Sequence, residues 1–300
     1  MITFFGMPSR SSGKIRGLEM SQALNGNFYD KNSLRLEYGP PGIFKTCVFI
    51  RDFNQHHAMK LKSGGHKIVY DVLDRPVADL HIAQKSNPKI NEINWKKYVH
   101  PCIDVFLVNN SLCKDKLSPH LLAHQNIIVT PHHAVSNSVI PKNDIEKTPK
   151  TVGYLGVQNQ IHQIEKIRNF CEDNDLEFVS TDLNTKEECV DFLKSIDIGI
   201  VFLEENDRTQ YVLKYKPSVK LINFQAMGIP AVCSPYESFK EYAPPTSYIC
   251  SDDIDKTLES IKMLKNNKDL RNSIYENGLK NAENYTLDKV VKIYKEFAVK

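Results

Sequence analysis

The sequence lacks several features that would place the protein in or beyond a membrane. It contains no apolar run close to the roughly 18 residues of a membrane-spanning helix. Its start, residues 2–5, has neither the basic residues nor the long apolar stretch of a secretory signal. None of its seven cysteines is spaced Cys-x-x-Cys, which argues against a zinc site and a disulfide framework. We therefore expect a cytoplasmic protein with no metal site and no cofactor.

Two ligand-binding motifs are also absent. Gly6, Gly13 and Lys14 outline a phosphate-binding loop, but the glycines are too far apart, and Ile15 replaces the Ser or Thr that would hold magnesium. No basic patch is interleaved with aromatic residues, as single-strand nucleic-acid binding requires. These absences exclude a P-loop nucleotidase and disfavour a nucleic-acid-binding protein.

Charge is distributed unevenly along the 300 residues. Residues 1–150 contain 20 Lys and Arg against 12 Asp and Glu, a net charge of +8, and nine of the ten histidines. Residues 151–300 contain 19 Lys and Arg against 24 Asp and Glu, a net charge of −5. The basic half predicts an anionic partner such as a membrane surface, a lipid phosphate or a nucleic acid; the alternative is a solvated surface without a partner.

Strand and helix patterns alternate in both halves, which is typical of parallel sheets with crossover helices. Residues 137–150 are polar with two prolines and have the composition of a linker. A strand–glycine–helix pattern restarts at Thr151-Val-Gly-Tyr-Leu-Gly156. We therefore predict an α/β protein with a first domain at 1–136, a linker at 137–150, a second domain at 151–284 and a last helix at 285–300.

The most informative stretch is residues 214–234. Pro217 suits a first helical turn, Gly228 suits the residue after a helix, and residues 231–233 read as a buried strand. The helix between them is mostly apolar, and Lys220 and Asn223, three residues apart, break that pattern on one face. Cations at a helix N-terminus, where N–H groups point outward, predict a phosphate site; the alternative is a buried helix whose lysine reaches water.

This stretch resembles a motif of GT-B nucleotide-sugar glycosyltransferases, especially the retaining family-four-like group. The matching residues are Pro217, Lys220, Leu221, Asn223, Phe224, Ala226, Gly228 and Pro230. Supporting matches are Tyr-Asp-x-x-Asp at 70–74, Pro-His-His at 131–133 and Gly-Tyr-Leu-Gly at 153–156. One departure is Asn223, which stands where the family usually has a ribose-binding Glu.

The resemblance implies two Rossmann-like, doubly wound domains that face each other across a cleft, with the last helix crossing back to the first domain. It implies a UDP- or GDP-sugar donor, held by Gly156, Lys216, Ser218, Lys220, Leu221 and Asn223. Lys220, Arg208 and His133 would be the catalytic residues. Gly156 is equally well explained as a tight-turn glycine.

Residues of the first domain are predicted to contact the acceptor, a glycan or a lipid-linked molecule. Ser12, Gly13 and Lys14 follow the first strand, and Asp71 and Asp74 follow the strand at 67–71. Ligands of open α/β sheets bind beyond such strand ends. The alternatives are an ordinary surface loop for the first group and helix capping for the two aspartates. His56 and His57 are further candidates, of which at most one can face a site.

The predicted function is thus sugar transfer from a nucleotide-sugar to an acceptor hydroxyl, retaining and metal-independent, in glycan or surface polysaccharide synthesis. We expect the protein to be cytoplasmic or peripheral to the membrane. Two alternatives are a phage-type transferase that glucosylates nucleic-acid bases and a GT-B-like partner subunit without catalysis.

Overall fold

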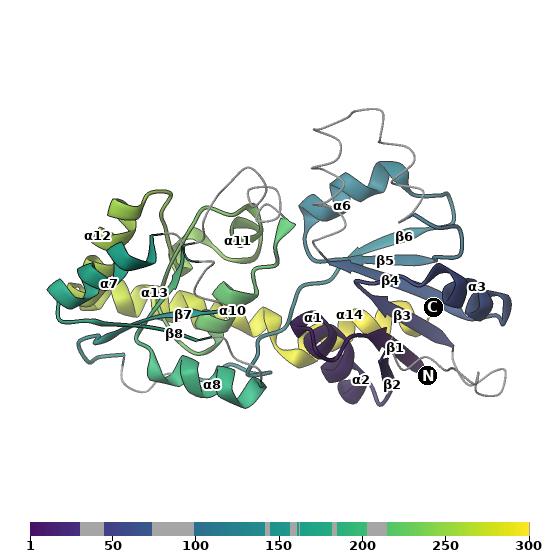
Figure 1. Cartoon of the computed structure of the whole chain (residues 1–300), viewed down its shortest axis with the longest axis horizontal. Helices are drawn as coiled ribbons and strands as arrows, with labels where there is room; N and C mark the ends of the chain where they lie inside the picture. Colours follow the sequence, from purple (N-terminus) through teal and green to yellow (C-terminus); the bar gives the residue numbers. More distant parts are fainter. Residues whose placement is uncertain are drawn as a thin grey trace. The chain divides into compact units, whose positions relative to one another are not determined.

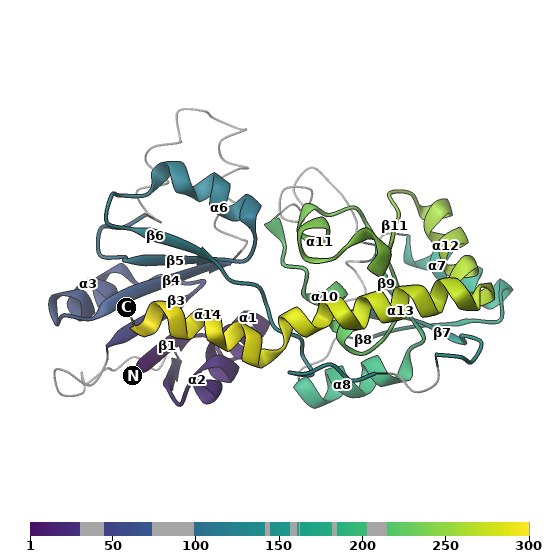
Figure 2. The ribbon, with the colours of Figure 1, turned by 180° about the vertical axis from the view of Figure 1, so that it is seen from behind.

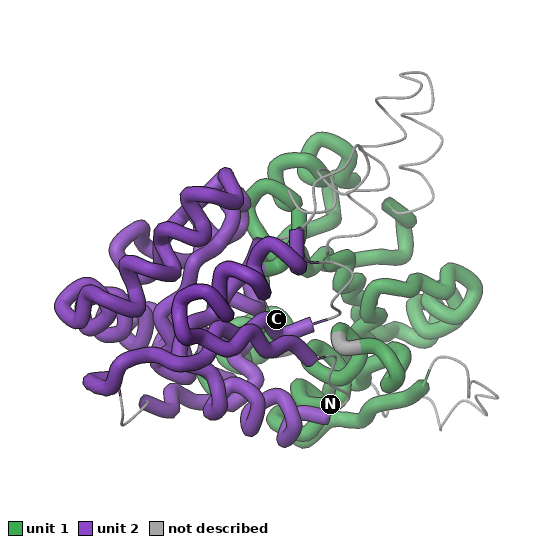
Figure 3. The backbone as a smooth tube through the Cα atoms, turned by 60° about the vertical axis from the view of Figure 1, so that its left-hand side comes forward, with its two compact units in different colours: residues 1–132, 211–217, 288–300 green, residues 133–210, 218–287 purple. Residues whose placement is uncertain are grey.

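The computed structural model describes residues 1–30, 45–73, 99–141, 145–156, 161, 163–181, 185–202 and 215–299. The chain divides into two compact units (Figure 3). Unit 1 comprises residues 1–132, 211–217 and 288–300, and unit 2 comprises residues 133–210 and 218–287. The described parts of the segment predicted as a linker, 137–141 and 145–150, lie in unit 2, and the predicted domain bounds stay a prediction.

Unit 1 is built on a parallel six-stranded sheet in the order β2-β1-β3-β4-β5-β6 (Figure 1). The strands are β1 (Ile2–Gly6), β2 (Asn27–Asp30), β3 (Thr46–Ile50), β4 (Lys67–Leu73), β5 (Val105–Val108) and β6 (Asn126–Val129). The strand order reverses between β1 and β3. In doubly wound sheets, ligands bind outside the carboxyl ends of the strands at this reversal.

Helices cover both faces of this sheet. On one face, Phe5, Phe49, Tyr70 and Phe106 form a core with α3 (Gln55–Ser63) and α6 (Ser111–Leu117), and the 3₁₀ turn η3 (Ser118–His120) follows α6. On the other face lies α14 (Leu287–Val299), whose Tyr294 ring is 5.9 Å from the ring of Phe4. Figure 2 shows α14 crossing the strands. From Asp288 onward, α14 thus belongs to unit 1.

The helical segment after β1 is irregular. It consists of α1 (Ser11–Gly13), the π-helical segment η1 (Lys14–Glu19) and α2 (Met20–Ala23). Gly17 lies in η1, where a Cβ would come within 2.8 Å of the Ile50 side chain. The lack of a side chain therefore lets this helix approach the sheet closely.

Unit 2 contains a parallel five-stranded sheet in the order β11-β10-β9-β7-β8. Its strands are β7 (Thr151–Leu155), β8 (Glu177–Thr181), β9 (Ile198–Val201), β10 (Ala231–Cys233) and β11 (Ile249–Cys250). The order reverses between β7 and β9. The helices are α7 (Ile164–Asp173), α8 (Lys186–Ser195), α10 (Val219–Ala226), α11 (Glu237–Tyr242), η5 (Pro245–Ser247), α12 (Ile254–Asn266), α13 (Lys268–Ala282) and η6 (Glu283–Tyr285).

The apolar face of α10 is buried between the sheet and α13. A Cβ on Gly199 of β9 would lie 2.7 Å from the Phe224 ring, so this glycine lets α10 lie directly on the strand. Gln225 donates to Ser247 Oγ at 2.9 Å, and Asn281 of α13 donates to Gln225 Oε1 at 2.8 Å. The two units together confirm the predicted α/β class with two doubly wound parallel sheets.

Candidate functional site

Helix α10 ends where the sequence predicts but begins two residues after Pro217, which therefore lies outside the first helical turn. Ser218 is its N-cap residue, and Gly228 follows it with a φ of +64° that only glycine adopts readily. Ser218 is buried, but its side chain makes no capping hydrogen bond, and Leu221 is fully buried in the core of unit 2. The N-terminus of a helix attracts anions through its dipole and its outward-pointing N–H groups, which is the basis for expecting a phosphate here.

Lys220 lies in the first turn of α10 and reaches the carboxyl end of β7. Its Nζ donates to the backbone oxygen of Leu155 at 2.5 Å and lies 3.9 Å from the centroid of the Tyr154 ring. Tyr154 is completely buried. The ammonium group is therefore held at the strand end next to the reversal of the sheet, where a ligand is expected.

Gly156 is the residue that directly follows β7, and it lies against Lys220. Its φ of +141° disfavours any residue with a side chain, and a Cβ there would collide with Lys220 Nζ. Its own N–H donates to Thr181 O at 3.0 Å, so that group is already occupied. Gly156 thus provides space for the lysine in a backbone conformation that favours glycine, and its role in donor binding stays a prediction.

Asn223, one turn after Lys220, is tied to the segment that enters unit 2. Its side chain is 5% exposed, and its Oδ1 accepts a hydrogen bond from the backbone N–H of Val135 at 2.9 Å. The neighbouring Ala134 N–H donates to Tyr285 O at 2.8 Å. Asn223 therefore fastens residues 134–135 to α10, a contact that its sequence position does not reveal.

The remaining residues predicted for the donor and for catalysis are spread over both units. His133 is the first residue of unit 2 and is 1% exposed. Lys216 is half-buried and belongs to unit 1. Arg208 and the predicted acceptor residue Asp74 lie outside the described residues. The roles of all four stay predictions.

Ser12, Gly13 and Lys14 lie in the first turns after the loop that follows β1. A Cβ on Gly13 would collide with the backbone oxygen of Met7, so a glycine is needed for this close approach of helix and loop. Arg10 in the same loop pairs with Asp52 after β3 at 3.3 Å. These residues lie at the carboxyl ends of β1 and β3, the reversal point of unit 1, where the acceptor prediction expects them.

Asp71 of β4 is engaged in a buried ion pair. Its Oδ2 accepts from Arg16 Nε at 2.7 Å and from the Tyr294 hydroxyl at 3.4 Å. Arg16 also donates through Nη1 to the carbonyl oxygens of Thr130 and Pro131, at 2.6 and 3.0 Å. Asp71 is fully buried, and its Oδ1 has no hydrogen-bond partner among the described residues. A cluster of this kind joins η1, β4, β6 and α14, so it holds unit 1 together.

His57 belongs to the hydrophobic core of unit 1. Its ring meets the rings of Phe5 and Phe49 edge-on, with centroids 5.0 and 5.6 Å apart, and it is 5% exposed. Burial lowers the pKa of His57 to about 4, with smaller contributions from the nearby His56 and Lys60. A neutral histidine packed among aromatic rings is a core residue, whereas His56 is exposed on α3.

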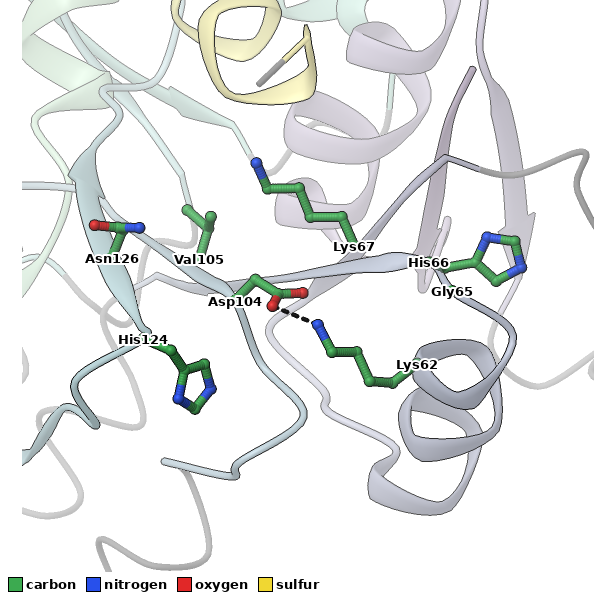
Figure 4. Close-up of a pocket in the computed structure, with 8 residues that line it drawn as sticks. All are labelled: Lys62, Gly65, His66, Lys67, Asp104, Val105, His124 and Asn126. Carbon is green, nitrogen blue, oxygen red and sulfur yellow. Dashed lines mark hydrogen bonds and ion pairs between the residues drawn. The ribbon is translucent and has the colours of Figure 1, made fainter.

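Unit 1 has a cavity of about 410 Å³ at the amino ends of β4, β5 and β6 (Figure 4). Its charged groups are used internally: Lys62 pairs with Asp104 at 2.5 Å, and Lys67 Nζ donates to Phe297 O at 2.7 Å. Figure 4 shows the Lys62 and Asp104 side chains pointing toward each other, while Lys67 points away from this pair. Because this is the end of the sheet opposite to the usual ligand site, the cavity is not the candidate site.

No three His, Cys, Asp or Glu side chains in the described ranges are grouped so that they could bind a metal ion. Among the described helices, none is long and apolar enough to cross a membrane.

Sequence comparison identifies no relative: no protein-family model matches the chain, and no curated protein does so. Solved structures do match. Sucrose-phosphate synthase from Thermosynechococcus elongatus superposes with a TM-score of 0.63 and 11% identity, over 100% of this chain and 99% of its own. HepE from Anabaena, in complex with UDP-glucose, superposes with a TM-score of 0.61 and 11% identity, over 99% of this chain and 98% of its own.

A third match is the lipopolysaccharide outer core galactosyltransferase WaaB, with a TM-score of 0.51 and 12% identity over 99% of this chain and 98% of its own. Identities this low show the fold and leave the activity to be tested. The chain has the GT-B fold of nucleotide-sugar glycosyltransferases, as the motif at residues 214–234 predicts.

Proposed function

We propose that this protein is a glycosyltransferase that moves a sugar from a nucleotide-sugar to an acceptor hydroxyl. One observation carries the proposal. The Lys220 ammonium is held beside Gly156 at the carboxyl end of β7, in the first turn of a helix whose N-terminus favours anions. A diphosphate bound there would meet a fixed positive charge and the backbone N–H groups of α10.

In the proposed reaction, the bond between the sugar and the diphosphate breaks, a bond to the acceptor oxygen forms, and the acceptor hydroxyl passes its proton to an oxygen of the departing diphosphate. Lys220 stabilises the negative charge that develops on the departing diphosphate, and a preorganised charge of this kind is often the largest catalytic term. Lys216 and Arg208 are proposed as further cations. We propose retention of configuration and catalysis without a metal ion, in line with the family that the motif resembles.

The donor that we propose is a UDP- or GDP-sugar, which is supported by the likeness to HepE, solved in complex with UDP-glucose. Asn223 would contact the ribose through its amide nitrogen, because its oxygen is bonded to Val135. Unit 1 would bind a glycan or lipid-linked acceptor through Ser12, Gly13 and Lys14, whereas Asp71 is fully buried in its ion pair with Arg16. The basic charge of the first half fits an anionic membrane surface, and surface polysaccharide synthesis is the pathway we favour.

The proposal is tested by thermal unfolding with UDP-, GDP-, ADP- and CMP-sugars. A donor that binds only the folded state raises the melting temperature, and the Lys220→Ala variant should lose that increase. Lys166→Ala is a matched control, because Lys166 pairs with Asp255 on the surface of the same unit. A full increase in the Lys220→Ala variant would show that the diphosphate binds elsewhere.

A GT-B-like subunit without catalysis is the second candidate, and the engagement of Asn223 with Val135 favours it. An Asn whose oxygen is occupied cannot accept from two ribose hydroxyls as a Glu would. Calorimetry distinguishes the two functions. Binding of a nucleotide-sugar followed by sugar transfer supports the enzyme, and the absence of any binding supports the subunit.

A further inference from the structure

Tyr154 and Lys220 make a contact that the proposed reaction does not yet explain. The tyrosine is the fourth residue of β7, completely buried, and the lysine ammonium lies 3.9 Å from the centroid of its ring. The next residue of the strand, Leu155, accepts a hydrogen bond from the same ammonium at 2.5 Å. Two consecutive residues of one strand therefore hold Lys220 Nζ from two directions.

The position of this ammonium is unfavourable without such contacts. A positive charge in the first turn of a helix is repelled by the helix dipole. A lysine side chain is also long and flexible, and it normally extends into water to keep its charge hydrated. The face of an aromatic ring and a backbone carbonyl both attract an ammonium group, so they offset these costs.

Of the two contacts, only the one with Tyr154 depends on a side chain. The carbonyl of Leu155 would be present with any residue at 155, whereas the ring face requires an aromatic residue at 154. Because Tyr154 is packed inside unit 2, its ring is fixed and can fix the ammonium in turn. The lysine is therefore preorganised: its side chain is ordered before a ligand binds, so binding does not carry the entropy cost of ordering it.

We infer that Tyr154 is a positioning residue, whose ring holds the Lys220 ammonium in place for the diphosphate of the donor. This inference rests on the proposed function, because it assigns the anion that Lys220 meets. It predicts that an aromatic ring at 154 is needed for tight binding of the diphosphate part of a ligand and has no effect on the nucleoside part.

The first experiment measures the contact itself, without any nucleotide. In protein labelled with ¹³C at lysine Cε, the Lys220 signal is identified by its loss in Lys220→Arg. The ring current of Tyr154 should shift the attached protons upfield in the wild type and in Tyr154→Phe. The shift should disappear in Tyr154→Met, which fills a similar volume without a ring. An unchanged shift in Tyr154→Met would overturn the inference.

The second experiment uses calorimetry to measure the affinity for UDP and GDP and, for comparison, the affinity for the corresponding nucleosides, uridine and guanosine. Tyr154→Phe should bind the diphosphate within about twofold of the wild type, and Tyr154→Met about tenfold more weakly, with nucleoside affinity unchanged. Equal diphosphate affinity in Tyr154→Met and the wild type would contradict the inference. If the wild type binds neither diphosphate, the proposed donor site is wrong, whereas the ring-current result still decides whether Tyr154 holds Lys220.

A series of ring-fluorinated phenylalanines at position 154 tests the inference even if the Tyr154→Met variant misfolds. Phenylalanine with one, two or three ring fluorines at position 154 keeps the shape of the ring and progressively weakens the attraction of its face for cations. Diphosphate affinity should fall stepwise along this series while the melting temperature stays nearly constant. A constant affinity would show that the ring only fills space.

Discussion

Arg16 Nε and Asp71 Oδ2 lie 2.7 Å apart, and both side chains are at most 1% exposed. The two residues are 55 positions apart, and they connect the helix after β1 with the carboxyl end of β4. Through Thr130 and Pro131 the same arginine holds the segment in which unit 1 passes to unit 2. Asp71, predicted as an acceptor contact, therefore has a structural role that can be measured separately.

Asp71→Asn should destabilise unit 1 by about 3 kcal/mol, because it leaves the Arg16 charge buried without a counter-charge. Urea unfolding followed by circular dichroism measures the loss. The matched control is Asp52→Asn in the exposed pair with Arg10, which should cost less than about 1 kcal/mol. Equal, small losses in both variants would contradict the structural role of the buried pair.

His57 predicts a pH dependence of stability. Its pKa in the folded protein is about 4, against 6.5 when unfolded, because burial disfavours the charged ring. Between these values the unfolded state binds a proton that the folded state does not, so stability falls as the pH falls from about 6.5 to about 4. At pH 5 the loss from this residue is about 2 kcal/mol.

The measurement is the free energy of unfolding at several pH values between 4 and 7. His57→Gln cannot titrate, so its stability should decline less toward low pH than that of the wild type. His56→Gln is the same substitution at the exposed neighbour and should follow the wild-type curve. A His57→Gln variant with the wild-type slope would show that the ring becomes charged without unfolding.

The hydrogen bond from Val135 to Asn223 gives a prediction for unit 2. Asn223→Ala leaves a buried N–H without an acceptor, which should cost about 1–3 kcal/mol of stability. Asn223→Asp keeps an acceptor oxygen and should recover most of this loss in thermal unfolding. If Asn223→Ala is as stable as the wild type, residues 134–135 do not depend on this side chain.

The sequence predicted the parts of the molecule that local rules determine. The end of helix α10 could be predicted because Gly228 acts on the backbone next to it, and β10 because its three residues are all apolar. The two parallel sheets followed from the alternation of strands and helices. Strand β2 was missed, because its four half-buried residues form an edge strand with little hydrophobic signal.

Contacts between distant residues could not be predicted in this way. Asn223 and Val135 are 88 positions apart, and nothing near either residue indicates the other. Tyr215 was assigned to a loop of the second domain, yet it is buried in unit 1, where its carbonyl accepts from Asn109 at 2.8 Å. Tyr154 lies within the Gly-Tyr-Leu-Gly motif at 153–156, but the family resemblance assigned a ligand-binding role only to Gly156 of that motif. Such pairings depend on how the chain folds back on itself.

Substitutions at Gly156 and Gly65 distinguish the effect of backbone strain on stability from the effect of a displaced Lys220 on diphosphate binding. Gly156→Ala introduces strain at a φ of +141°, and its methyl group also displaces Lys220 Nζ. Gly65→Ala introduces strain at a φ of +82°, where nothing lies within 4 Å of the new methyl group. Both variants should lose about 1–3 kcal/mol of stability.

Only Gly156→Ala should also weaken the binding of UDP or GDP, by about tenfold or more, because the ammonium can no longer rest against β7. Thermal unfolding and calorimetry on both variants test the two effects. If Gly156→Ala binds UDP or GDP as tightly as Gly65→Ala does, the substitution causes backbone strain only. Diphosphate affinity then does not depend on the position of the Lys220 ammonium.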